Sequence, residues 1–233
     1  MITVVPAIIS ENLDDLQRQV KIVSPFIDLV QIDIMDGKFA PSLSWPYLGS
    51  QMSELRAIKS KEELLGVSMV DYELDVMIED PEAEVDEWID AGVRSLIIHI
   101  ESTSNLQDII DRTKARGAGV ALALQPETDS DALYKWIEQV DSTGSPQVDF
   151  VQFMGSQKIG YHGVELDKNV LDKIRDLRNR YKELIIGVDI GVNLETAPGL
   201  VRAGANKLVS GSTIFESSDI GGTIEALAHL DEK

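Results

Sequence analysis

Short runs of apolar, mostly β-branched residues recur along the chain. They alternate with segments in which apolar residues are spaced by three and four positions. Runs of the first kind are typical of buried strands, and the second spacing places apolar side chains on one face of a helix. The predicted strands cover residues 3–9, 29–35, 70–78, 95–100, 120–124, 150–154, 184–190 and 207–211.

Helices are predicted between these strands. Their apolar stripes are Leu13, Leu16, Val20 and Val23; Val85, Trp88 and Ile89; Leu106, Ile109, Ile110 and Thr113; Leu133, Trp136, Ile137 and Val140; and Val170, Ile174, Leu177 and Tyr181. The less regular segment 41–69 is expected to hold a loop and a helix around Met52, Leu55 and Ile58. Residues that favour helix ends stand at two places, Asn105 with Gly117 and Asn193 with Gly204.

Eight strand–helix units in 233 residues leave two main architectures, a closed eight-stranded barrel and an open doubly wound sheet. Periodicity alone does not separate them. We favour the barrel because eight short, evenly spaced units leave no surplus length, and because the chain has the size of one such barrel. The sequence therefore predicts an α/β protein whose residues 1–233 form a single (β/α)₈ TIM barrel domain.

Composition narrows the function classes. The net charge of -19 disfavours nucleic acid and anionic membrane surfaces as partners, because both attract clustered Lys and Arg. The absence of cysteine excludes disulfides, thiolate metal ligands and a Cys nucleophile. No Walker or dinucleotide glycine motif is present, so no nucleotide cofactor is expected. The first residues do not look like a signal peptide and no apolar run is long enough to span a membrane, so we expect a cytoplasmic protein.

Polar residues at the ends of apolar strands are the candidates for chemistry, because active sites of barrels lie at the carboxyl ends of the strands. Alternation places Gln31, Asp33 and Met35 on one face of the second strand. Asp75 ends the third strand and Asp189 the seventh. Buried carboxylates are costly unless they meet a cation, a proton or hydrogen-bond donors. The pattern indicates a metal site, a proton-transfer site, or both.

Each candidate also has a plain structural interpretation. Asp36 and Gly37 could form only a turn, and Asp75 could be a solvated loop residue. His99, followed by Glu101, could face the barrel mouth or be a satisfied structural histidine. Three methionines that would line such a mouth are core residues by default, namely Met35, Met77 and Met154.

Glycine-rich loops near the end of the chain form a second signal. In barrels, the loops after the late strands and a helix N-terminus often hold phosphate, and a small anion can bind there whatever the net charge. Ordinary turn chemistry is the alternative. The predicted phosphate-binding residues are Gly160, Tyr161, His162, Gly163, Gly191, Gly211 and Ser212.

At these residues the chain resembles the ribulose-phosphate 3-epimerase family. The resemblance follows nearly the whole chain in order. It runs through PAIIS at 6–10, QIDIMDGKFAPSLSW at 31–45, ELDVMIEDPE at 73–82, HIE at 99–101, QPET at 125–128, GYHGVELDKNVLDKIRDLR at 160–178 and VDIGVNLETAPGLVRAGANKLVSGSTIF at 188–215.

The resemblance implies a (β/α)₈ barrel of carbohydrate metabolism, in the pentose phosphate pathway, that interconverts ribulose 5-phosphate and xylulose 5-phosphate. In the family, one Asp removes the C3 proton, a second returns one on the opposite face, and a divalent metal, commonly zinc, steadies the enediolate. The acids that match are Asp33 and Asp189. The resemblance also implies that the methionine trio lies over the metal, that the late glycine loops bind phosphate, and that the chain forms a homo-oligomer.

Two departures change the expected metal. The family has histidines where this chain has Gln31 and Asp75. One amide and three carboxylates (Gln31 with Asp33, Asp75 and Asp189) form an oxygen-only ligand set, which suits magnesium, manganese or calcium better than zinc. Other departures are Ala7 for an early Ser, Gln125 for Asn, a rewritten loop at 157–163, and Ile190 for the first Gly of an Asp-Gly-Gly run.

Three functions follow from this pattern. The first is an isomerase that epimerises ribulose 5-phosphate with Asp33 and Asp189 as the acid/base pair. The second is a non-catalytic sugar-phosphate-binding barrel with a decayed metal site, indicated by Ala7, Gln31 and Asp75. The third is an epimerase for a different ketose phosphate, indicated by the rewritten loop, since loops set substrate choice on this fold.

Overall fold

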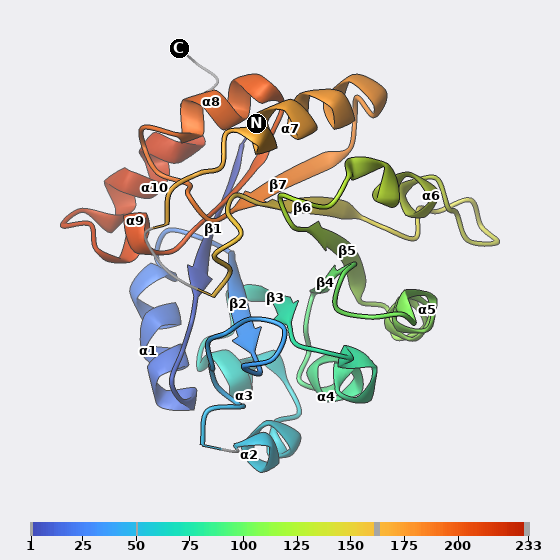
Figure 1. Ribbon diagram of the computed structural model, residues 1–233. Coiled ribbons are helices and arrows are strands. Elements are labelled where there is room, and N and C mark those ends of the chain that lie inside the picture. The colour runs from blue at the N-terminus through green and yellow to red at the C-terminus, as the bar shows by residue number, and fades with distance from the viewer. Residues whose placement is uncertain (1, 50, 161–163, 231–233) are drawn as a thin grey trace. The chain divides into compact units, whose positions relative to one another are not determined.

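A computed structural model describes residues 2–49, 51–160 and 164–230. Its eight strands form a closed barrel in which each strand neighbours the next in sequence order (Figure 1). This confirms the predicted barrel and excludes the open doubly wound sheet. The strands are β1 (Thr3–Ile8), β2 (Leu29–Met35), β3 (Asp71–Met77), β4 (Ser95–His99), β5 (Gly119–Leu124), β6 (Phe150–Met154), β7 (Ile185–Asp189) and β8 (Lys207–Ser210).

Helices follow the strands as expected for this fold. They are α1 (Leu13–Val23), α2 (Met52–Ala57), α3 (Lys61–Leu65), α4 (Val85–Asp90), α5 (Leu106–Ala115), α6 (Tyr134–Ile137), α7 (Asn169–Arg180), α8 (Ala197–Ala203), α9 (Ser212–Phe215) and α10 (Ile220–Ala228), with 3₁₀ helices η1 (Pro81–Ala83) and η2 (Ser130–Leu133). The stripes predicted for α1, α4, α5 and α7 are the faces that these helices bury, except that Leu13 and Tyr181 are only half-buried and Tyr181 follows the end of α7.

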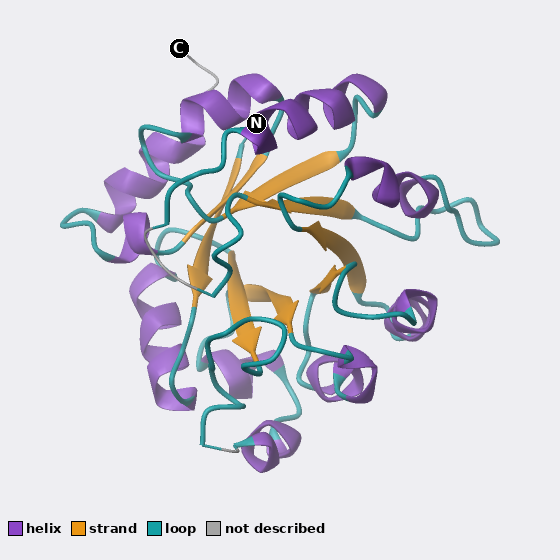
Figure 2. Cartoon of the chain, in the orientation of Figure 1, coloured by secondary structure: helices purple, strands orange, loops and turns teal. Residues whose placement is uncertain are grey.

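The chain divides into two compact units, Ala7–Val120 and a second made of Met1–Pro6 with Ala121–Lys233. In each unit the helices lie outside their own strands (Figure 2). In the first unit β2 and β3 are paired along their full length, and in the second β6, β7 and β8 run side by side. Among the described residues, no helix is long and apolar enough to span a membrane. That residues 1–233 form one domain stays a prediction.

One predicted helix is shorter than its stripe. The 3₁₀ helix η2, in which Leu133 is 0% exposed, runs directly into α6, and α6 holds Trp136 and Ile137 but ends before Val140. Val140 is 57% exposed and pairs with Pro146 in an antiparallel bridge. Asp141 and Gly144, whose φ is +85°, form the turn between them. The apolar spacing was correct for a helix, but turn-forming residues immediately after it end the helix early.

The two predicted caps also differ in detail. Asn105 directly precedes α5, but its side chain makes no capping hydrogen bond. Asn193 lies upstream of α8, whose first flanking residue is Thr196. The Asn193 carboxamide oxygen accepts from the backbone N–H groups of Glu195 and Thr196, at 2.8 and 3.0 Å. Asn193 therefore shapes the turn that enters the helix rather than the helix start itself.

Candidate functional site

The end of β2 presents an amide and a carboxylate to the barrel interior. Gln31, Asp33 and Met35 are all buried, as are the residues between them. The Gln31 side-chain nitrogen donates a hydrogen bond of 2.8 Å to Asp33 Oδ1. The Gln31 nitrogen therefore holds the neighbouring carboxylate, and its carboxamide oxygen is the atom with the chemistry of a metal ligand.

A second buried carboxylate stands beside the first. Asp33 and Asp75 are register partners on the paired strands β2 and β3. Asp75 is 0% exposed, so the interpretation of this residue as a solvated loop residue is wrong. Like charges on adjacent strands repel each other unless a cation, a proton or donors offset them. This pair is therefore a place where a cation would be stabilising.

A buried histidine touches Asp75. His99, at the end of β4, is 0% exposed and its Nε2 lies 2.9 Å from Asp75 Oδ1. The ring of Phe39 meets the His99 ring edge to face, with centroids 5.0 Å apart. The hydroxyl of Ser102 donates to the His99 carbonyl at 2.9 Å. His99 thus belongs to the acidic site through Asp75, a pairing that the sequence alone did not indicate.

Ser44 and Asp36 hold the loop after β2 but were not predicted as site residues. The Ser44 hydroxyl donates to the Asp33 carbonyl at 3.1 Å and accepts from the Met35 N–H at 3.0 Å. Asp36 Oδ1 accepts from the Lys38 N–H at 2.9 Å, and Gly37 has a φ of +77°. Asp36 and Gly37 therefore form a turn, which is the structural interpretation given for them above. The signal that could have identified Ser44 is its place in the stretch 31–45, which carries part of the family resemblance.

Asp189 ends β7 in the second unit and is 6% exposed. Its Oδ1 accepts a 2.7 Å hydrogen bond from the Ile190 N–H. Ile190 has a φ of +71°, a left-handed conformation that is strained for a β-branched residue. Gly155, after β6, is required here because a Cβ at that position would lie 2.0 Å from the Ile190 carbonyl oxygen. Close backbone packing thus fixes the strained turn that follows Asp189.

The predicted phosphate loops are placed only in part. Gly191 has a φ of +74°, and a Cβ there would lie 2.9 Å from the Leu166 backbone nitrogen. Gly211 precedes α9, which begins at Ser212. Gly160 is also left-handed, with a φ of +79°. The remaining predicted residues of that loop, Tyr161, His162 and Gly163, lie outside the described residues.

The loop after β7 is tied to the end of β8. The hydroxyls of Ser210 and Thr213 both donate to the Val192 carbonyl, at 2.9 and 3.0 Å. These bonds fix the loop of Gly191 next to the start of α9. The methionines expected to line the site are buried at strand ends, with 0% exposure for Met35, 2% for Met77 and 1% for Met154. The burial of these three methionines agrees with both interpretations, core packing and lining of the site.

The donor set can be compared with the metals it would suit. The buried acids are Asp33, Asp75 and Asp189, and the amide oxygen of Gln31 is the further candidate ligand. All are hard oxygen donors, which fit a divalent cation such as magnesium, manganese or calcium. Among the described residues, the imidazole in contact with an acid of the set is that of His99, whose Nε2 lies 2.9 Å from Asp75 Oδ1.

Comparison with known proteins agrees with the resemblance to an epimerase family. A family model described as "Ribulose-phosphate 3 epimerase family" matches residues 3–215. The ribulose-phosphate 3-epimerase of Bacillus subtilis is 30% identical over 227 residues, which cover 94% of this chain and 94% of that protein. That of Eremothecium gossypii is 26% identical over 219 residues, covering 93% of this chain and 87% of that protein.

Solved structures show the same architecture at lower identity. A 3-hexulose-6-phosphate synthase from Salmonella typhimurium superposes with a TM-score of 0.66 at 18% identity, covering 99% of this chain and 98% of that one. At this identity the likeness supports the fold alone.

Proposed function

Because the chain belongs to the ribulose-phosphate 3-epimerase family, we propose that it interconverts ribulose 5-phosphate and xylulose 5-phosphate by proton transfer at C3. The observation that carries the proposal is the burial of two aspartates at strand ends, Asp33 on β2 and Asp189 on β7. In a closed barrel of parallel strands all carboxyl ends share one rim, which is where active sites form.

The two carboxylates account for inversion without a covalent intermediate. One Asp takes the C3 proton of the ketose, which leaves an enediolate, and the other returns a proton to the opposite face of C3. The Gln31 hydrogen bond holds the carboxylate of Asp33, and the Ile190 N–H holds that of Asp189. Both aspartates are thereby oriented by short-range donors from their own strands or the following turn, which is how a site keeps its reacting groups in place.

A divalent cation suits the acids of this site. Asp33, Asp75 and Asp189 are the candidate acidic ligands, and the Gln31 carboxamide oxygen is a further one. When bound, such an ion would stabilise negative charge that develops on the substrate oxygens. We propose magnesium, manganese or calcium rather than zinc, because the set lacks the two histidines of the family. The phosphate of the substrate is assigned to the loops of Gly191, Gly211 and Ser212 and to segment 160–163.

An epimerase assay tests the proposal directly. Purified protein, treated with chelator and then given magnesium, manganese or zinc, is incubated with ribulose 5-phosphate in D₂O. We expect xylulose 5-phosphate carrying deuterium at C3, with higher turnover in magnesium or manganese than in zinc. Absence of both turnover and deuterium exchange under every metal would reject catalysis and favour the non-catalytic sugar-phosphate-binding alternative. Stoichiometric zinc in the protein as purified would reject the metal assignment alone.

A different ketose phosphate is the second candidate substrate. Ile190 places a branched side chain directly after Asp189, where the family has glycine. A bulkier residue at a strand end can change which sugar fits, because loops and strand ends set substrate choice in barrels. Parallel assays with other pentulose and hexulose phosphates separate the two substrates. That the chain forms a homo-oligomer stays a prediction.

A further inference from the structure

We propose that His99 is a positioning residue that orients the Asp75 carboxylate toward a divalent cation. The inference rests on the cation site proposed above and adds a role that follows from this chain's departure from its family. The carboxylate of Asp75 stands where the family has a metal-binding imidazole, so its orientation has to be set by a neighbour. The structure places one buried donor against it.

The contact has a defined direction. A carboxylate oxygen can only accept, so His99 Nε2 is the donor nitrogen in the 2.9 Å contact with Asp75 Oδ1. Both side chains are 0% exposed, so water does not compete for this hydrogen bond. Asp75 Oδ1 thereby contacts His99, and Oδ2 is the oxygen that would bind the cation.

The His99 ring is packed by an aromatic neighbour, and its backbone is held by a second residue. Phe39, from the loop after β2, packs its ring against the imidazole. Ser102 bonds the His99 carbonyl through both its backbone N–H, at 3.0 Å, and its hydroxyl, at 2.9 Å. Because His99 is already ordered, little conformational entropy would be lost when Asp75 binds a cation. In the Gln31–Asp33 pair a side-chain N–H likewise holds one oxygen of a buried acid.

Two amide substitutions at position 99 separate positioning from packing. The terminal nitrogen of glutamine is as many bonds from Cα as His Nε2, whereas that of asparagine matches Nδ1 and falls short of Asp75. Manganese affinity is measured by calorimetry for the wild type, His99→Gln and His99→Asn. We expect His99→Gln to bind close to the wild type and His99→Asn to bind about 10- to 100-fold more weakly, the usual effect of losing a group that orients a ligand. Unfolding in chelator reports any loss of fold independently of the metal.

A measurement on the unaltered protein covers the case in which neither variant folds. The chain has 3 histidines, so the ring ¹⁵N signals of His99 can be assigned by exclusion in a few variants. Saturation with magnesium, which is diamagnetic, is expected to shift the Nε2–H signal of His99 and to leave that of His229 unchanged.

The outcomes distinguish the two proposals. If the wild type binds manganese and both variants bind it equally, or if magnesium leaves the His99 signal unmoved, the positioning role is wrong and the cation site stands. If the wild type binds neither ion, the cation site is wrong, and the role of His99 toward it is wrong as well. Loss of affinity in His99→Asn with retention in His99→Gln supports the proposal.

Discussion

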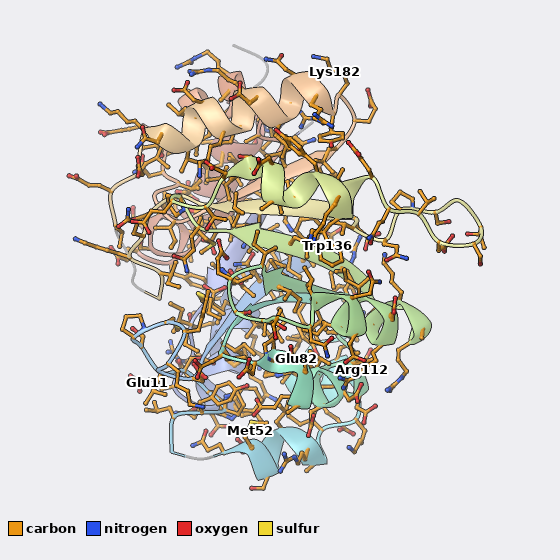
Figure 3. The ribbon with its side chains drawn as sticks, turned by 45° about the vertical axis from the view of Figure 1, so that its right-hand side comes forward. Glu11, Met52, Glu82, Arg112, Trp136 and Lys182 are labelled. Atoms are coloured by element: carbon orange, nitrogen blue, oxygen red, sulfur yellow. The ribbon has the colours of Figure 1, made fainter. Side chains whose placement is uncertain are left out.

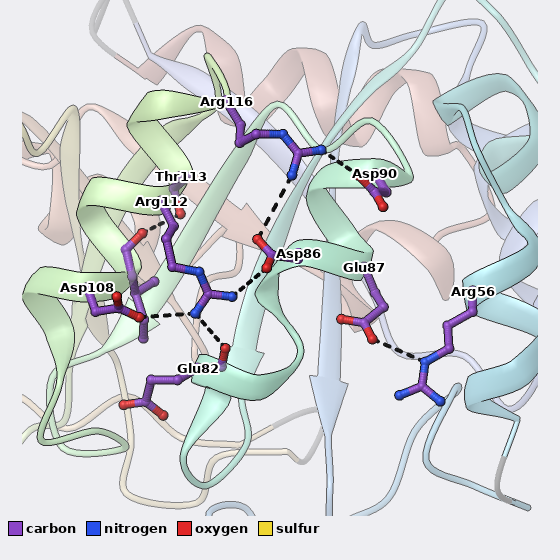
Figure 4. Close-up of polar contacts among 10 residues, drawn as sticks. Arg56, Glu82, Asp86, Glu87, Asp90, Asp108, Arg112, Thr113 and Arg116 are labelled. Atoms are coloured by element: carbon purple, nitrogen blue, oxygen red, sulfur yellow. Dashed lines mark hydrogen bonds and ion pairs between the residues drawn. The ribbon is translucent and has the colours of Figure 1, made fainter.

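Carboxylates in the unit Ala7–Val120 are held in two contrasting ways. On its surface, α4 and α5 are joined by arginines, and Glu82 and Arg112 are neighbours there (Figure 3). Arg112 Nη2 lies 2.6 Å from Asp86, and its Nη1 lies 3.0 Å from Asp108 and 2.7 Å from the Glu82 carbonyl oxygen (Figure 4). Arg116 adds contacts to Asp90 and Asp86. In the interior, Asp33 and Asp75 are flanked by a neutral amide and an imidazole.

The surface cluster and the interior carboxylates differ in solvent exposure and therefore in their contribution to stability. The side chains of Arg112 and Asp86 are 31% and 50% exposed, so water screens their attraction and the pair contributes little. Asp75 and His99 are 0% exposed, so the carboxylate loses its hydration and depends on the groups that touch it. The surface cluster can be explained by stability alone, whereas the interior acids are costly for stability and call for a function.

The largest expected effect is that of removing an interior carboxylate. Asp33→Asn keeps the size of the side chain but can no longer accept the C3 proton. We expect kcat to fall by about 10²- to 10⁴-fold, the usual contribution of a general acid or base. The measurement is the epimerase rate together with thermal unfolding. Asp86→Asn, a matched change on the surface, is the control and should leave the rate unchanged. Equal rates in the two variants would show that Asp33 is not part of the catalytic machinery.

The strands and the acids at their ends could be predicted because they depend on local pattern. Runs such as 29–35 are rich in β-branched residues, and alternation places Asp33 on the same face as Gln31 and Met35. The contact between His99 and Asp75 could not be predicted from the sequence. It depends on the register between β3 and β4 and on the loop that brings Phe39 over the imidazole. The helix that ends with α6 was predicted too long, for the opposite reason. Its apolar spacing was local and correct, but the turn at Asp141 overrode it.

Asp189 is held in a third way, by strained backbone, and releasing that strain should have the next largest effect. Left-handed backbone costs a residue with a Cβ about 1–2 kcal/mol. Ile190→Gly removes this cost, while glycine adds about 0.5–1 kcal/mol of unfolded-state entropy. We therefore expect the free energy of unfolding, measured in urea, to rise by up to about 1 kcal/mol. Ile185→Gly in regular β7 is the matched control and should lower it. A lower stability in both variants would mean that the Ile190 side chain contributes more than its backbone costs.

Breaking the surface cluster should have a smaller effect. Its aspartates, Asp86 first and then Asp108, raise the pKa of Arg112. Arg112→Ala should lower the free energy of unfolding by roughly 0.5 kcal/mol, and the loss should shrink in high salt, since screening weakens exposed pairs. Arg56→Ala is the control, because Arg56 makes one ion pair, 3.1 Å from Glu87. Urea unfolding at two salt concentrations measures both. A cost for Arg112→Ala that is independent of salt would indicate packing rather than charge.

The smallest expected effect concerns an exposed carboxylate of the second unit. Tyr181 and then Arg180 lower the pKa of Glu138 by hydrogen bonding, with contacts of 2.7 and 2.9 Å to its Oε1. Because the folded-state pKa lies below the unfolded one, the contribution of Glu138 to stability is complete above the ordinary Glu pKa. It is lost as the pH falls through the lowered value. An NMR titration of the Glu138 carboxyl carbon should show this low pKa, and Tyr181→Phe should move it upward while Arg180 remains. An unchanged pKa in Tyr181→Phe would mean that the hydrogen bond between Tyr181 and Glu138 does not persist in water. Water can replace such an exposed contact, whereas it does not reach the buried contact between His99 and Asp75.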